Sequence, residues 1–65
     1  MIEVEIKRHP FHPETHRLVK VIHRGRVYAT SWAEPFPTEA EVRQVWRSAR
    51  WQFRPYDEST GRYCD

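Results

Sequence analysis

Four arginines recur along one predicted helix at a spacing that brings them to a single edge. The spacing i, i+4, i+7 and i+11 confines their side chains to roughly a 60° sector of the helix. They are Arg43, Arg47, Arg50 and Arg54. A guanidinium group presents a planar fork of donors that matches phosphate and carboxylate oxygens. The row could follow a phosphate backbone or dock on an acidic protein face, or it could be an ordinary solvated face in which Glu39 pairs with Arg43.

A second group of basic and aromatic residues falls on one predicted β-hairpin. Its members are Lys20, Arg24, Arg26, Tyr28 and Trp32. Aromatic rings stack on nucleic-acid bases while neighbouring cations meet phosphates, and the same mixture is typical of protein–protein hot spots. The competing interpretation places Tyr28 and Trp32 in the core, because a domain this small needs its aromatic residues for burial.

Histidines form a third group, in which His9, His12 and His16 follow the spacing H-x2-H-x3-H. Zinc accepts such ligands. The two prolines in this loop oppose a compact clamp, however, and the chain has no C-x2-C pair, since Cys64 is its single cysteine. We therefore expect no metal and no cofactor, and we expect these histidines on the surface. No spacing picks out a nucleophile and its general base, so we expect a binding protein and not an enzyme.

The length and composition of the chain limit the fold that positions these groups. Sixty-five residues make one domain, residues 1–65, with 38% hydrophobic and 31% charged residues. That composition is too apolar for a disordered tail, and no apolar run approaches the roughly 20 residues of a membrane span. A single cysteine excludes an internal disulfide and favours a reducing, cytoplasmic compartment. The N-terminal residues lack the basic and apolar segments of a signal peptide.

Three strands are predicted, at residues 2–8, 17–23 and 26–32, from alternating or β-branched patterns. The last two form a hairpin, whose loop could have three residues or two. A three-residue loop with Gly25 in a bulge is preferred, because Arg24–Gly25 is not the favoured pair of a two-residue turn. That loop would place Val21 opposite Val27 and Val19 opposite Ala29. It would leave Lys20, Arg26, Tyr28 and Trp32 on the opposite, exposed face. A two-residue loop would place the second-strand valines with Tyr28 on one face.

A helix is predicted at residues 38–50, beginning at Thr38, with Glu41 completing a capping box. Its apolar stripe is Val42, Val45, Trp46 and Ala49. Pro55 must end it, whereas residues 51–53 could close the helix or begin a strand. The expected fold is α+β, a three-stranded antiparallel sheet with one helix packed on one face and a short optional C-terminal hairpin.

Two segments, residues 25–28 (GRVY) and 36–42 (FPTEAEV), resemble the hairpin-to-helix join of the integrase-type arm-binding domain. The resemblance implies three strands followed by a helix, with the sheet entering the DNA major groove. It gives Lys20, Arg24, Arg26 and Tyr28 the DNA-facing role. The Pro-rich loop at residues 10–13 and the aromatic tail depart from that pattern. In size and style the chain is also similar to stand-alone phage proteins, including anti-CRISPR inhibitors, which bind and block a host nuclease complex.

Two functions from different classes follow. The preferred one is a phage-encoded inhibitor that docks on a host protein or ribonucleoprotein complex, and the alternative is a nucleic-acid-binding module. A net charge of +2 is low for a dedicated nucleic-acid binder. Acidic residues also occur throughout the chain, and they would repel phosphate unless the fold gathers them on the far side. They are Glu3, Glu5, Glu14, Glu34, Glu39, Glu41, Asp57, Glu58 and Asp65. The oligomeric state stays open.

Overall fold

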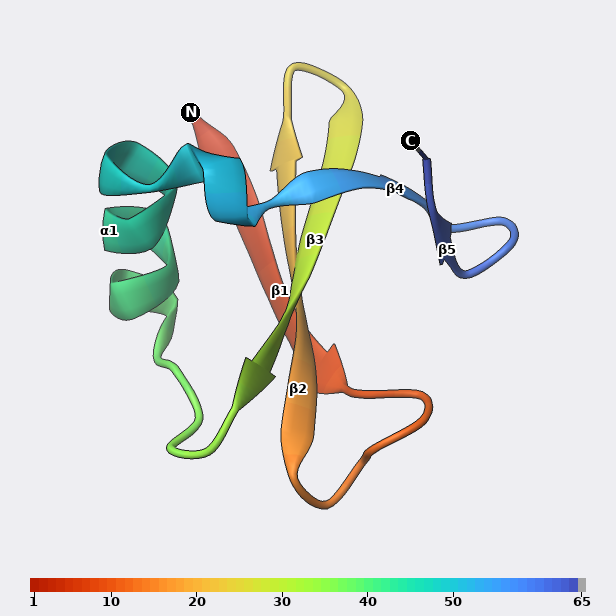
Figure 1. Cartoon of the computed structure of the whole chain (residues 1–65). Coiled ribbons are helices and arrows are strands. Elements are labelled where there is room, and N and C mark those ends of the chain that lie inside the picture. Colours follow the sequence, from red (N-terminus) through yellow and green to blue (C-terminus); the bar gives the residue numbers. More distant parts are fainter. Residues whose placement is uncertain (65) are drawn as a thin grey trace.

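The protein is an α+β domain in which one helix and a C-terminal hairpin lie on opposite sides of an antiparallel sheet (Figure 1). The structure is a computed structural model that describes residues 1–64. The strand order is β1-β2-β3-β4-β5, so the sheet is larger than the three strands expected from sequence. The elements are β1 (Ile2–Arg8), β2 (His16–His23), β3 (Arg26–Ala33), α1 (Glu39–Ser48), the short 3-10 helix η1 (Arg50–Gln52), β4 (Arg54–Asp57) and β5 (Arg62–Tyr63).

The β2–β3 hairpin turns on two residues, so the expected three-residue loop is wrong. His23 pairs with Arg26 across the turn. Arg24 and Gly25 have φ angles of 53° and 76°, and two consecutive left-handed residues are the signature of a type I′ turn. The twist of that turn matches the right-handed twist of the strands. This geometric match prevails over the unfavourable choice of arginine at a left-handed position.

The two-residue turn decides which side chains reach the core. Val21 pairs with Tyr28 and Val19 with Thr30, so the β2 valines face the helix together with Tyr28. Val27 and Ala29 lie on the opposite face, which corrects their expected pairing with the valines. The buried core cluster consists of Val19, Val21, Val42, Trp46 and Phe53. Half-buried side chains that pack against it are Ile2, Val4, Tyr28, Trp32 and Val45.

The helix begins as its sequence predicts and ends earlier. The Thr38 hydroxyl accepts a hydrogen bond from the Glu41 backbone N–H at 3.2 Å. The Glu41 carboxylate in turn accepts one from the Thr38 backbone N–H, and the two bonds together confirm the capping box. Trp46 is buried at 3% exposure, as the packing prediction required. α1 ends at Ser48, and the chain continues in η1. This tighter turn buries Phe53 in the core and leaves Trp51 80% exposed.

The C-terminal hairpin of β4 and β5 covers part of the sheet face away from the helix. β4 pairs with β3 through Tyr28 and Ala29. The rings of Tyr56 and Tyr63 meet edge to face at 5.5 Å, which holds β5 to β4. Glu58, in the turn of this hairpin, forms an ion pair with Lys20 on β2.

The chain direction gives the molecule two chemically different ends. Ile2 pairs with His23, so the start of β1 lies beside the β2–β3 turn. Arg50, just beyond the end of α1, lies at the same end beside His23. The opposite end, here called the far end, holds the loop between β1 and β2 and the connector that leads into α1 (Figure 1). Within residues 1–64, no helix is long and apolar enough to cross a membrane.

Candidate functional site

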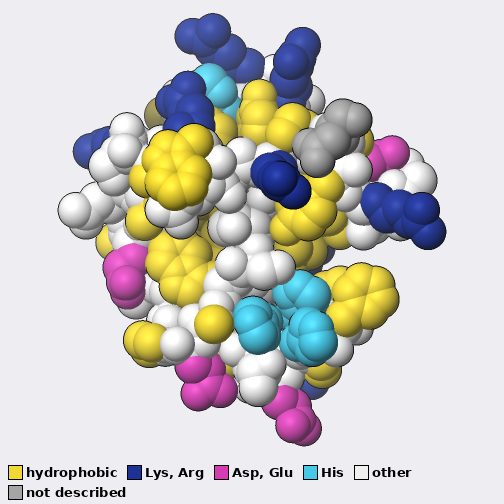
Figure 2. Space-filling view, in the orientation of Figure 1, with side chains coloured by type: hydrophobic (Ala, Val, Ile, Leu, Met, Phe, Trp, Pro, Cys, Tyr) yellow, Lys and Arg dark blue, Asp and Glu magenta, His cyan; other side chains and the backbone are white. Residues whose placement is uncertain are grey.

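Six basic side chains gather at the end of the molecule that holds the β2–β3 turn. They come from the hairpin, from α1 and from η1, and we call this surface the basic end. Its members are His23, Arg24, Arg26, Arg43, Arg47 and Arg50. Figure 2 shows dark-blue cationic side chains along the upper edge of the molecule, the edge that holds the β2–β3 turn in the same view of Figure 1.

Two shallow hollows cut into the basic end and share His23 and Arg50 in their walls. One, of about 460 Å³, lies between the hairpin and η1 and is also lined by Tyr28. The other, of about 240 Å³, lies between the start of β1 and α1 and is also lined by Trp46. Among the described residues, no aspartate or glutamate lines either hollow. An anion that enters either hollow therefore meets cations and aromatic edges.

Contacts with the core hold two of these arginines in place. The guanidinium carbon of Arg50 lies 4.4 Å from the centroid of the buried Trp46 ring, a cation–π arrangement. The Arg43 guanidinium donates a hydrogen bond to the Ile2 carbonyl at 3.3 Å and lies 3.7 Å from a carboxylate oxygen of Glu39. Because these contacts fix the side chains before any ligand arrives, less conformational entropy is lost on binding.

His23 is the titratable group of the basic end. Its ring lies 5.5 Å from that of Trp46, in an edge-on arrangement. Partial desolvation lowers the pKa of His23 below its usual value, and the charges of Arg24 and Arg50 lower it further. The imidazole is therefore held toward its neutral form until an anion approaches.

Glu39 pairs with Arg43 at 3.7 Å and so reaches the basic end, whereas the other acidic side chains of residues 1–64 form no ion pair with its members and line neither hollow. The loops and helix start at the far end carry Glu14, Glu34, Glu39 and Glu41. Glu3, Glu5 and Glu58 lie on the sheet side away from α1, where Glu5 and Glu58 are paired with lysines. The Asp57 carboxylate accepts hydrogen bonds from the backbone and hydroxyl of Ser59. Figure 2 shows magenta side chains at the lower edge, at the left and at the upper right.

The structure brings together six of the nine predicted site residues, and the other three lie elsewhere. Arg54 is not on a helix but in β4, so the expected four-arginine row is interrupted. Trp32 pairs with Arg17 toward the far end and packs on the core. Lys20, which was expected on an exposed face, is only 4% exposed. The six that converge are Arg24, Arg26, Tyr28, Arg43, Arg47 and Arg50.

Lys20 lies on the sheet face away from the β2 valines, as expected with either turn, and it is buried because the C-terminal hairpin covers that face. Its ammonium group pairs with Glu58 and lies 3.5 Å from a carboxylate oxygen of Glu5. Burial alone would lower the pKa of Lys20, but hydrogen bonding and charge from Glu58 and Glu5 outweigh that effect and raise it. Lys20 therefore stabilises the fold and does not contribute to the basic end.

Sequence reasoning missed two residues of this region, His23 and Trp51. His23 lies at the hairpin tip with either turn length, and its position directly before Arg24 in the sequence was the signal that could have found it. Trp51 alternates with Phe53, a pattern that leaves open which of the two is buried. In the structure Phe53 enters the core and Trp51, next to Arg50, faces solvent.

The three loop histidines cluster at the far end without converging on a metal site. The rings of His9, His12 and His16 lie 5.4–5.8 Å apart, centroid to centroid. The Nδ1 atom of His9 accepts hydrogen bonds from the backbone N–H groups of Phe11 and His12, and its Nε2 lies 3.0 Å from the Ser31 hydroxyl. Both ring nitrogens of His9 are thus occupied. Within residues 1–64, no three His, Cys, Asp or Glu side chains form a group that could hold a metal ion.

No family model, no curated protein and no solved structure matches this chain. The strand–strand–strand–helix order implied by the resemblance to the integrase-type domain is present, and it continues into two further strands. Of the residues to which that resemblance gives a DNA-facing role, Arg24, Arg26 and Tyr28 lie together and Lys20 lies buried on the other face.

Proposed function

We propose that this protein is a non-enzymatic binding protein whose basic end binds the phosphate backbone of a nucleic acid. The observation that carries the proposal is the separation of charge. Six basic side chains meet at one end, where among residues 1–64 only Glu39 forms an ion pair with one of them, Arg43, while the acidic side chains of the loops and of the sheet lie elsewhere. Arginine forks match phosphate oxygens in geometry and charge.

The distribution of acidic residues reverses the preference drawn from sequence. A protein partner was favoured because acidic residues occur in every predicted element and would repel phosphate. The fold places the helix acids Glu39 and Glu41 at the start of α1, and it places Arg47 near the end of the same helix. The low net charge of +2 therefore conceals a local concentration of arginine at one end of the molecule, and a clustered basic surface is the electrostatic pattern of nucleic-acid-binding domains.

Binding of short duplex and single-stranded DNA and RNA, followed by fluorescence anisotropy from 50 to 300 mM salt, tests this proposal. We expect the logarithm of the association constant to fall linearly with the logarithm of salt concentration. Arg26→Gln and Arg47→Gln should each reduce that slope by about one unit, because each removes about one phosphate contact. Lys7→Gln, which removes a charge from the far end of β1, is the matched control and should leave the slope unchanged. Binding with no salt dependence, or an equal loss in the control, would contradict the proposal.

A second candidate, a protein or ribonucleoprotein partner, is supported by one observation, the exposure of Trp51. Its ring is 80% exposed and follows Arg50 directly, and exposed tryptophan beside arginine is typical of protein hot spots. This candidate includes the phage-type inhibitor expected from sequence. A partner captured from host lysate that survives nuclease treatment, and is lost with Trp51→Ala, would support it. If nuclease treatment abolishes the capture, the partner is held through nucleic acid, which supports the first candidate.

A further inference from the structure

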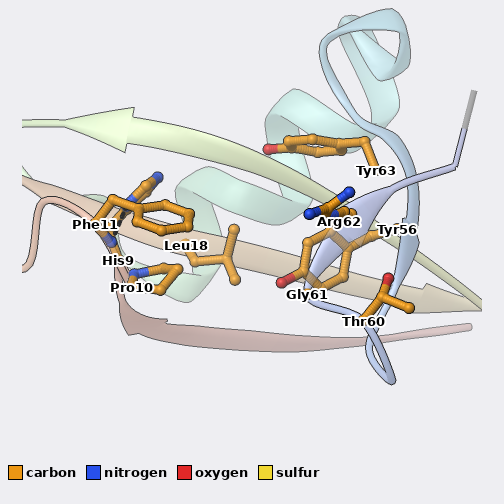
Figure 3. A pocket seen from close by; sticks show the side chains of 9 residues that line it. All are labelled: His9, Pro10, Phe11, Leu18, Tyr56, Thr60, Gly61, Arg62 and Tyr63. Atoms are coloured by element: carbon orange, nitrogen blue, oxygen red, sulfur yellow. Dashed lines mark hydrogen bonds between the residues drawn. The ribbon is translucent and has the colours of Figure 1, made fainter.

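A cleft distinct from the basic end opens between the β1–β2 loop and the C-terminal hairpin, on the sheet face away from α1 (Figure 3). It encloses about 530 Å³, within the range of small-molecule sites. Its walls come from segments far apart in sequence. They are formed by His9, Pro10, Phe11, Leu18, Tyr56, Thr60, Gly61, Arg62 and Tyr63.

Aromatic rings form opposite walls of this cleft. Phe11 stands on the loop side, and Tyr56 and Tyr63 stand on the hairpin side, with Leu18 between them at the base (Figure 3). Phe11 is 78% exposed, an unusual position for a phenylalanine, whereas Leu18 is buried. Walls of this kind accept a flat ring, because aromatic groups gain from stacked or edge-to-face contact beyond simple burial.

Arg62 supplies the guanidinium cation in the lining of the cleft. Arg62 lies on the exposed strand β5, and it forms no ion pair with any carboxylate in residues 1–64. The other basic group in the lining, His9, already uses both ring nitrogens within the protein. The hydroxyls of Tyr56 and Thr60 add neutral polar groups on the same side of the cleft (Figure 3).

We propose that this cleft binds a planar aromatic ring that carries an anionic group, the chemistry of a nucleotide. The ring would lie between Phe11 and the tyrosines of the hairpin, and the anionic group would meet the Arg62 guanidinium. A single cation beside apolar walls suits a small monoanionic or dianionic ligand better than an extended polyanion. The inference does not rest on the basic end, which lies on other elements, so either can fail alone.

The experiment is a titration of the whole chain, labelled with 15N, observed through its backbone amides by NMR. The probes are adenosine 5′-monophosphate and uridine 5′-monophosphate, with benzoate, uncharged adenosine and inorganic phosphate as comparisons. We expect saturable shifts of the Phe11, Leu18 and Gly61 amides with the nucleotides, and none with inorganic phosphate. Benzoate binding as tight as that of the nucleotides identifies a small aromatic acid as the source of the same chemistry.

Two substitutions should weaken nucleotide binding about tenfold each, Phe11→Ala by loss of stacking and Arg62→Gln by loss of the charged contact. Both side chains are exposed, so both variants should fold. The matched controls are Trp51→Ala and Arg8→Gln, which remove an exposed ring and an exposed charge that line neither the cleft nor the two hollows of the basic end. Shifts that do not saturate, shifts confined to the basic end, adenosine binding as tight as the monophosphate, or equal weakening in the controls would overturn the proposal.

Discussion

The guanidinium carbon of Arg50 lies 4.4 Å from the centroid of the Trp46 ring, so a surface cation rests on the largest side chain of the core. The same ring contacts His23, Tyr28 and Phe53, at centroid distances of 5.2–5.5 Å. Trp46 therefore connects the folding of the domain to the shape of the basic end. A change in this ring should disturb both stability and binding.

Trp46→Ala should be severe, with a loss of about 3–5 kcal/mol in the free energy of unfolding. The ring is 3% exposed, and a domain of this size cannot collapse fully around the cavity left by its removal. Urea unfolding followed by circular dichroism measures the loss. Trp51→Ala is the matched control, because Trp51 is 80% exposed, and it should change stability by less than about 0.5 kcal/mol. Equal effects of the two variants would contradict the packing.

Gly25→Ala should destabilise the protein by about 1–2 kcal/mol, because φ at this position is +76° and a β-carbon disfavours that region. No atom lies within 4 Å of the added carbon, so the effect isolates backbone strain. Arg24→Asn should act in the opposite sense and stabilise the turn by about 0.5–1 kcal/mol, since asparagine tolerates the left-handed region. Thermal unfolding compares them, and stabilities that both equal that of the parent protein would rule out the two-residue turn.

The hairpin shows how much of the fold the sequence could predict. The strands, the Thr38 capping box and the burial of Trp46 followed from local patterns, because each depends on neighbours within a few residues. The face of each hairpin residue depends on turn length, and a change of one residue moves every side chain of β3 to the other face. Arg24 is a rare choice for a type I′ turn, so turn chemistry favoured the longer loop. From that one error followed the expectation that Tyr28 and Trp32 lie on the exposed face, whereas both pack against the core.

The C-terminal hairpin was foreseen only as an option, for a physical reason. β4 has four residues including Pro55, and β5 has two, so neither carries the alternation that marks a strand. Their stability comes from contacts with distant residues, such as the pair between Glu58 and Lys20.

The candidate site was predictable by residue type. Its clustering was not, because it depends on where α1 ends relative to the β2–β3 turn.

Glu58→Ala should destabilise the protein by about 1–2 kcal/mol, because it leaves the buried Lys20 ammonium with Glu5 alone. The expected loss of stability is small because the Glu58 side chain is 51% exposed, so that water screens the ion pair. Glu14→Ala, in an exposed loop, is the control.

The pH dependence of stability gives a second readout, because the pKa of Lys20 is raised in the folded state. The contribution of Lys20 to stability is therefore complete below pH 10.5, its ordinary pKa, and is lost as pH rises through its pKa in the folded protein. A parent and a Glu58→Ala variant with the same stability at pH 8 would contradict this role.

The loop that carries the histidine cluster should loosen in mild acid. Desolvation lowers the pKa of His9, and the neighbouring rings of His12 and His16 lower it further. Its Nδ1 must be unprotonated to accept the two backbone hydrogen bonds. A lowered folded pKa means that this stability is complete above pH 6.5 and is lost as pH falls through the folded value. Exchange of the Phe11 and His12 amides should quicken relative to that of Val42 in α1, and unchanged relative rates would refute the mechanism.

Nucleic-acid binding should tighten as pH falls below about 6.5, with uptake of a proton at His23. In the free protein the pKa of His23 is lowered by desolvation and by the charges of Arg24 and Arg50. A bound phosphate opposes those charges and favours the imidazolium, so the pKa in the complex should be higher than in the free protein. Between the two values the logarithm of the association constant should rise by up to about one unit per unit of pH.

Anisotropy titrations of one oligonucleotide between pH 5 and pH 8, at constant salt, measure this dependence. His23→Gln should bind with an affinity that changes little over the range, because it cannot gain the charge. His12→Gln, which removes a histidine from the far end, should keep the pH dependence of the parent protein. Circular dichroism at each pH confirms that the domain stays folded over this range. A pH dependence that survives in His23→Gln would show that the proton is taken up elsewhere and would remove His23 from the binding surface.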